Sequence, residues 1–179
     1  MPAPSRPITG LLLIVAVVLL AGCSSDANRN PLEVTVERCP ALAVVGGTGS
    51  LTRFRGKGRD ADDILYEATI TGTRLECHQG DEVVSEVSFE IVAQRGPALR
   101  GATDVALPYF VAVMRDNSEI VAKDVYMARI HFAADAERAG TREVIRQRLP
   151  SIDQARRYNY EILVGFQLRP EDVTYNLLR

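Results

Sequence analysis

The sequence predicts an all-β fold: an antiparallel β-sandwich of about seven to eight strands with a short C-terminal helix. Three observations lead to this expectation. Many short segments alternate apolar and polar residues with a period of two, which is typical of strands that bury one face. Residues with turn chemistry separate several of these segments. Apolar residues at helical spacing are few.

The expected strands follow one another from residue 31 to residue 168. The alternation begins after Pro31, so the folded domain is expected to begin there. Thr71-Gly72-Thr73 and Asp116-Asn117-Ser118 are expected to form turns between consecutive strands. In chain order the strands are expected at residues 31–36, 41–45, 64–70, 74–77, 87–93, 107–115, 119–132 and 160–168.

Helical signals are confined to two places. Residues 134–147 could hold a helical turn or two, although Gly140 interrupts them. Pro170, followed by Glu171 and Asp172, is typical of a helix start, because proline suits the first helical position. We therefore expect one short helix at the C-terminus.

The N-terminus has the pattern of a targeting segment. Arg6 precedes an apolar run at residues 11–21, and these eleven residues are too few to cross a bilayer core, which needs roughly 20. The run ends in Leu20-Ala21-Gly22-Cys23, which resembles the lipobox of bacterial lipoproteins. The resemblance implies a signal peptide at residues 1–22 and a diacylglycerol and fatty acids, such as palmitate, on Cys23. The alternative is a simple membrane anchor with an incidental cysteine.

The same resemblance predicts where the protein resides. Acyl chains on Cys23 would hold the protein on a membrane without an inserting surface of its own. Ser24 follows the cysteine, where an aspartate would often signal retention in the inner membrane, so the outer membrane is favoured, with the domain facing the periplasm. Residues 23–30 are then the lipidated N-terminus and a polar tether, and residues 31–179 are a single β-rich periplasmic domain.

Two cysteines remain once Cys23 is assigned to the lipid. Cys39 and Cys77 are expected to form a disulfide, because an even remainder in an oxidising compartment favours pairing. A metal or redox pair is the alternative, but the chain has no CxxC motif and only two histidines.

Composition and motifs exclude several classes of function. With 21 basic and 23 acidic side chains, the charge balance argues against a nucleic-acid partner. Gly46-Gly47-Thr48-Gly49 follows an apolar segment, as in a dinucleotide-binding turn, but no helical pattern succeeds it, and a flexible loop is the expected structure.

Catalytic chemistry has little support in the sequence. His78 lies in a turn-like stretch, and His131 lies in a strand pattern that would point it to solvent. There is no GxSxG or HExxH motif, and Asp62-Asp63 lies on a loop. We expect no enzyme activity, no cofactor and no metal site.

The densest charge forms a candidate contact loop, which consists of Arg53, Phe54, Arg55, Lys57 and Arg59. The basic residues would attract anionic surfaces, and Phe54 would supply an apolar contact. The alternative is a solvated loop in which Phe54 packs inward and three aspartates, at positions 60, 62 and 63, cancel the charge. A weaker basic cluster is formed by Arg138, Arg142, Arg146 and Arg148.

Several stretches are similar to a family of uncharacterised envelope lipoproteins from alphaproteobacteria. They are Cys39-Pro40, Leu51-Thr52-Arg53-Phe54 with Gly58-Arg59-Asp60, Arg95-Gly96-Pro97 with residues 108–113, and Val164-Gly165-Phe166-Gln167-Leu168 with Tyr175-Asn176. The resemblance covers most of the mature chain and implies a β-rich lipoprotein of the cell envelope.

Two functions stay open on the sequence. The domain could be a binding or scaffolding module, with an envelope protein as a possible partner. It could instead be a carrier or chaperone that holds a small or lipidic ligand between its sheets. A side-chain-filled interior would favour the first, because a carrier needs a cavity. The oligomeric state is not predicted.

Overall fold

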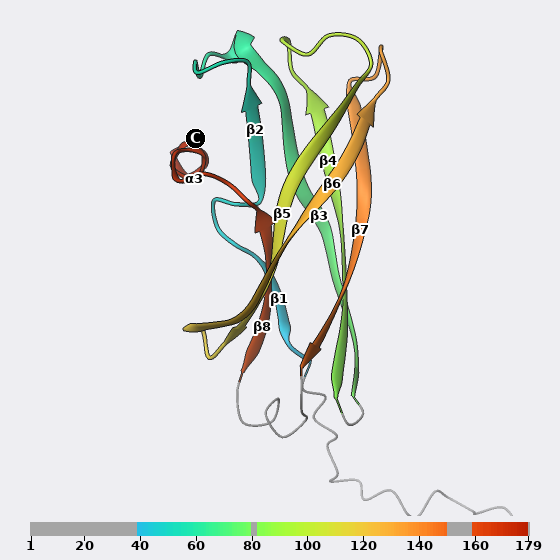
Figure 1. The fold of residues 1–179 in the computed structure, drawn as a ribbon, viewed down its shortest axis with the longest axis vertical. Helices are drawn as coiled ribbons and strands as arrows, with labels where there is room; N and C mark the ends of the chain where they lie inside the picture. Colours follow the sequence, from blue (N-terminus) through green and yellow to red (C-terminus); the bar gives the residue numbers. More distant parts are fainter. Residues whose placement is uncertain (1–38, 80–81, 150–158, 179) are drawn as a thin grey trace, which may run out of the picture. The chain divides into compact units, whose positions relative to one another are not determined.

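The computed structural model describes residues 39–79, 82–149 and 159–178. Eight strands form two four-stranded sheets that face each other, and a short helix follows the last strand (Figure 1). The first sheet has the order β1-β8-β5-β6 and the second has β2-β3-β4-β7. The strands are β1 (Ala41–Val44), β2 (Ser50–Phe54), β3 (Ile64–Gln79), β4 (Val83–Arg95), β5 (Thr103–Arg115), β6 (Glu119–Phe132), β7 (Arg138–Leu149) and β8 (Tyr160–Phe166). A 3-10 turn, η1 (Ala61–Asp63), precedes β3, and the helix is α3 (Pro170–Leu177).

This architecture confirms the predicted sandwich with its C-terminal helix. The expected strand at residues 31–36, the signal peptide, Cys23 and the tether all lie outside the described residues.

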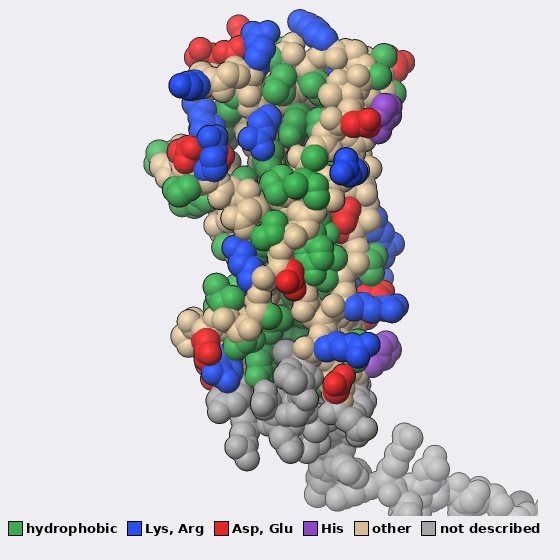
Figure 2. All heavy atoms as spheres, viewed as in Figure 1, with side chains coloured by type: hydrophobic (Ala, Val, Ile, Leu, Met, Phe, Trp, Pro, Cys, Tyr) green, Lys and Arg blue, Asp and Glu red, His purple; other side chains and the backbone are tan. Residues whose placement is uncertain are grey.

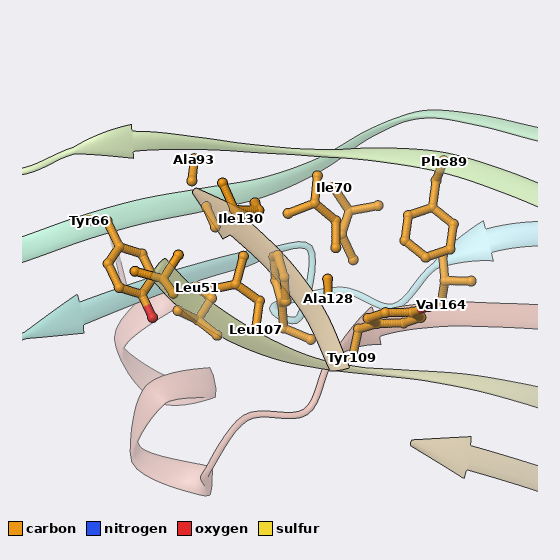
Figure 3. Packing of buried hydrophobic residues seen from close by; sticks show 14 of the residues in the cluster. Leu51, Tyr66, Ile70, Phe89, Ala93, Leu107, Tyr109, Ala128, Ile130 and Val164 are labelled. Carbon is orange, nitrogen blue, oxygen red and sulfur yellow. The ribbon is translucent and has the colours of Figure 1, made fainter. Parts of the chain in front are cut away.

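The period-two pattern places one face of each central strand in a shared core. In β4, Val87, Phe89, Ile91 and Ala93 are all almost fully buried, and the alternate residues of β8 are buried in the same way. Figure 3 shows Phe89 and Tyr109 approaching each other across the interior, with their ring centroids 5.3 Å apart. Burying each large apolar side chain contributes about 1.5–3 kcal/mol, so this face is what holds the two sheets together.

One hydrogen bond joins the two sheets inside this core. The Tyr109 hydroxyl on β5 donates to Glu143 Oε2 on β7, at 2.8 Å. Burial, together with the adjacent Glu143 carboxylate, raises the pKa of Tyr109 far above its ordinary value. The phenol therefore stays protonated and serves as a fixed donor between the sheets.

All strand pairs are antiparallel except that of β1 and β8, which is parallel. After β1 the chain leaves the first sheet and joins the second as β2. Gly47 has a φ of +74° in this short link, a conformation that glycine adopts without strain. The Gly46–Gly49 stretch is therefore a crossing between sheets, and a strand rather than a helix follows it.

The expected helical turn at residues 134–147 is wrong. This segment is mostly strand β7, which pairs with β4 from Leu149 opposite Val83 to Arg138 opposite Gln94. The sequence of β7 lacks a clear alternation of apolar and polar residues, because β7 is an edge strand and its outward positions carry arginines. Charged side chains on an edge discourage pairing with another chain.

The turn expected at Thr71-Gly72-Thr73 is also wrong. β3 continues through it, and the register with β4 shifts between Thr71 and Arg74. Gly72 has a φ of +60°, so the turn-favouring residue accommodates a bulge in a long strand. The turn at Asp116-Asn117-Ser118 is confirmed: Asp116 and Asn117 have φ values of 49° and 55° between β5 and β6.

None of the helices in the described ranges has the length and apolarity needed to span a membrane.

Candidate binding site: a basic hollow beside the C-terminal helix

The candidate contact loop begins on a strand. Residues 50–54 form β2, where the sequence suggested an irregular loop, and the register with β3 shifts between Arg53 and Phe54. The connection to β3 then closes through two backbone hydrogen bonds, from Arg55 N to Asp63 O at 2.8 Å and from Asp63 N to Asp60 O at 3.0 Å. The basic residues are thus carried by a short, hydrogen-bonded connection.

Phe54 packs inward and is only 8% exposed. Its ring meets the ring of Tyr175 on α3 edge to face, with centroids 5.5 Å apart. The guanidinium of Arg59 lies 5.0 Å from the Phe54 centroid and 5.5 Å from the Tyr175 centroid. Phe54 therefore anchors the loop to α3 and is not an exposed contact for a partner.

Two of the basic side chains are engaged in ion pairs. Arg55 lies 2.8 Å from Asp63, and Arg59 lies 2.8 Å from Asp172 on α3. The burial of Phe54 and the Arg55–Asp63 pair fit the alternative interpretation of a solvated loop that neutralises its own charge. Arg59 differs from that interpretation, because its partner, Asp172, belongs to α3.

Arg53 and Lys57 differ from them. Within the described residues, neither forms an ion pair. Both line a hollow of about 440 Å³ between this loop and the start of α3, which we call the basic hollow. Its other lining residues are Thr52, Phe54, Gly56, Gly58, Arg59, Arg169, Glu171 and Asp172. Figure 2 shows basic and acidic side chains gathered at the edge of this face, where Figure 1 places β2 and α3.

The hollow holds four basic side chains and two carboxylates. Both carboxylates are engaged locally: Glu171 lies 3.1 Å from Arg169, and Asp172 pairs with both Arg169 and Arg59. The positive charges of Arg53 and Lys57 are therefore in excess.

Asp172 is the link between the loop and the helix. Burial of its carboxyl opposes ionisation, but hydrogen bonds from Arg169 and Arg59 outweigh that effect and hold the pKa of Asp172 below its ordinary value. An acid whose pKa is lower in the folded than in the unfolded protein stabilises the fold when ionised. This contribution is present above the ordinary value of 3.8 and is lost as the pH falls through the lower folded pKa.

We predict that Asp172→Asn lowers the free energy of unfolding by about 1–2 kcal/mol at neutral pH, because two charge-assisted hydrogen bonds weaken. Urea unfolding measured at neutral pH and again well below pH 3.8 should show the difference from wild type shrinking in acid. Asp62→Asn, at an exposed position of η1, is the control and should differ little from wild type at either pH. A deficit in Asp172→Asn that persists unchanged in acid would contradict this role.

The sequence predicts helix α3 but assigns its side chains no role in the contact loop. Asn176 Nδ2 donates to the carbonyls of Gly47 and Ser50, both at 2.8 Å, and so fastens the helix beside β2. Arg169, Glu171 and Asp172 complete the hollow from a segment more than a hundred residues further along the chain. The only sequence signals were the predicted helix start and the resemblance at Tyr175-Asn176.

Cys39 and Cys77 lie at disulfide distance, with Cα atoms 6.0 Å apart, as predicted. Cys39 immediately precedes β1 of the first sheet, and Cys77 lies near the end of β3 in the second. The pair joins the two sheets where the described chain begins.

The remaining candidates do not come together into a site. His78 is exposed on β3, and His131 is exposed on β6, where its Nδ1 lies 2.7 Å from Asp104 Oδ1. In the part of the chain that is described, no three His, Cys, Asp or Glu side chains are close enough to hold a metal ion.

The second basic cluster lies along β7. Arg146 is 3.0 Å from Glu86, and Arg148 is 3.9 Å from Glu82, so acidic neighbours balance part of its charge. Arg142 donates to the Ser88 hydroxyl at 3.4 Å.

The chain matches no family model, and no curated protein or solved structure is significantly similar to it.

Proposed function

We propose that this protein is a lipid-anchored module of the bacterial outer envelope that binds or scaffolds other envelope components and performs no catalysis. The observation that carries the proposal is the packed interior. Among the described residues, apolar side chains from both sheets pack against one another between the sheets, as at Phe89 and Tyr109. A carrier would need that space for its ligand, so the packing favours a protein that acts through its surface.

The anchor and the compartment belong to the same proposal. Cys23 carries the lipid, and the domain faces the periplasm from the outer membrane. The spacing of Cys39 and Cys77 supports an oxidising compartment, because stable disulfides are characteristic of secreted and periplasmic proteins.

The binding element in this proposal is the candidate contact loop. Only those of its basic side chains that are not held in ion pairs are expected to contact a partner. Arg55 and Arg59 are held by Asp63 and Asp172, and reversing either charge would disturb the loop itself. Lys57 is exposed and unpaired among the described residues, so it is the position where a charge can be reversed without disturbing the fold.

One experiment tests the anchor and the loop together. Cells labelled with a radioactive fatty acid are crosslinked, and the tagged protein is recovered from their membranes. Wild type should carry the label and bring down a crosslinked partner. Cys23→Ser should lose the label and remain an unprocessed precursor, whereas Lys57→Glu should keep the label and lose the partner. Arg74→Glu, an exposed charge reversal on β3, should keep both.

Label on Cys23→Ser would refute the lipid anchor. Partner recovery that is equal for Lys57→Glu and wild type would show that the contact loop is only a solvated connection.

A further inference from the structure

Three of the four basic side chains of the contact loop line the basic hollow. The basic residues Arg53, Lys57 and Arg59 line the basic hollow, whereas the loop's three aspartates, at positions 60, 62 and 63, do not. Arg55 pairs with Asp63 outside this lining, at 2.8 Å, so the lining itself carries two more basic than acidic side chains.

We infer that the basic hollow binds a phosphomonoester group, with Arg53 and Lys57 as the residues that contact it. The inference rests on the proposed function in one respect, the contact loop as a binding element, and it does not depend on the lipid anchor. A phosphomonoester carries about −1.5 to −2 charges near neutral pH, which matches the two excess positive charges. Arginine and lysine are the side chains that bind phosphate oxygens most strongly.

The two carboxylates of the hollow do not oppose this ligand. Asp172 accepts hydrogen bonds from Arg59 at 2.8 Å and from Arg169 at 3.1 Å, and Glu171 lies 3.1 Å from Arg169. Their charges are balanced by residues that also line the hollow. Arg59 is further fixed against two aromatic rings, so these pairs act as a rigid wall.

The hollow also has the space that such a ligand needs. Its volume of about 440 Å³ lies within the range of roughly 300–1,000 Å³ for small-molecule sites and exceeds what a bare phosphate group fills. A Cβ atom added at Gly56 would meet nothing within 4 Å, so the approach beside Lys57 is open. The ester can therefore extend beyond the phosphate.

The phosphomonoester could come from a small soluble molecule or from the headgroup of a phosphatidic-acid type of lipid. Calorimetric titration of the full-length chain in non-ionic detergent distinguishes them with three probes: inorganic phosphate, glycerol phosphate and short-chain phosphatidic acid. Short-chain phosphatidylcholine, a zwitterionic phosphodiester, is the negative control. Similar affinity for glycerol phosphate and phosphatidic acid supports a soluble ester, whereas a preference for phosphatidic acid supports the lipid.

The decisive variant is the double substitution Arg53→Gln with Lys57→Gln. It should weaken binding at least about tenfold, since each residue loses a charge-assisted contact with the phosphate. The control is Arg74→Gln with Arg100→Gln, which removes the same charge from exposed positions outside the hollow and should bind as wild type does. The charge-preserving swap Arg53→Lys with Lys57→Arg should retain most of the affinity.

The inference fails if none of the three phosphate probes binds wild type. It fails equally if the control pair loses as much affinity as the hollow pair, because binding would then reflect net charge alone. Urea unfolding of each variant checks that the fold is intact. A protein that keeps its label and partner in the crosslinking experiment but binds no phosphate retains the proposed function and loses this inference.

Discussion

Breaking the Cys39–Cys77 bond is expected to lower the free energy of unfolding by about 4 kcal/mol. The bond closes a loop of about 39 residues, and without it the unfolded chain regains the conformational entropy that this closure removes. The two positions are 38 residues apart in sequence, and the bond joins the start of β1 to the far end of β3. For a domain of this size, such a change corresponds to a fall of roughly 10 °C or more in melting temperature.

Cys39→Ala is the cleaner variant for this measurement. Cys39 is exposed, so its substitution removes the bond and little else. Cys77 packs against Val83, Val113 and Tyr160, so Cys77→Ala would add a loss of core packing to the loss of the bond. Thermal unfolding should therefore place Cys39→Ala close to reduced wild type and Cys77→Ala somewhat below both.

Reduction supplies the control within the same experiment. A reducing agent should lower the melting temperature of wild type and leave that of Cys39→Ala unchanged. Two reactive thiols in native, unreduced wild-type protein would refute the pairing.

The parts of the fold that follow from local pattern could be predicted from the sequence. Central strands bury one face completely, so apolar residues recur at every second position, as in Val87, Phe89, Ile91 and Ala93. Turns that require a positive φ can also be predicted, because they favour particular residue types, as at Asp116 and Asn117.

The two wrong predictions concern an edge strand and a bulge, where apolar and polar residues do not alternate strictly. β7 is an edge strand whose inward position 143 is a glutamate that accepts a hydrogen bond from Tyr109, so strict alternation of apolar residues is absent. Thr71-Gly72-Thr73 has turn chemistry, but the same chemistry also suits a bulge within a strand.

Only the part of the basic hollow that the contact loop contributes could be predicted from the sequence. The local sequence reveals the basic residues of the loop, but not which of them remain unpaired. That depends on Asp172 and Tyr175, which reach the loop only after the chain has crossed both sheets. Sheet order and the parallel pairing of β1 with β8 are equally non-local.

Arg95 is a structural residue that the sequence did not single out. It ends β4, and its guanidinium donates to four backbone carbonyls. Two of them, Leu99 at 3.3 Å and Gly101 at 2.9 Å, belong to the β4–β5 connection. The other two, Ala133 at 2.6 Å and Ala136 at 2.7 Å, belong to the β6–β7 connection.

The five donors of an arginine in a fixed planar fork make such a multiple contact possible. The guanidinium also lies 5.1 Å from the ring centroid of the fully buried Phe132. One side chain thus fixes two connections at the same end of the sandwich.

Arg95→Met should lower the free energy of unfolding by about 2–4 kcal/mol, because it keeps an unbranched apolar stem but removes every donor to these carbonyls. Arg95→Lys should recover only a minor part of the loss, since an ammonium group cannot reach four acceptors at once. Arg100→Met is the matched control: it lies exposed in the same β4–β5 connection, and its effect on urea unfolding should stay within about 0.5 kcal/mol. If Arg95→Lys proves as stable as wild type, charge alone accounts for the residue's contribution, and the fork of hydrogen bonds does not hold the two connections.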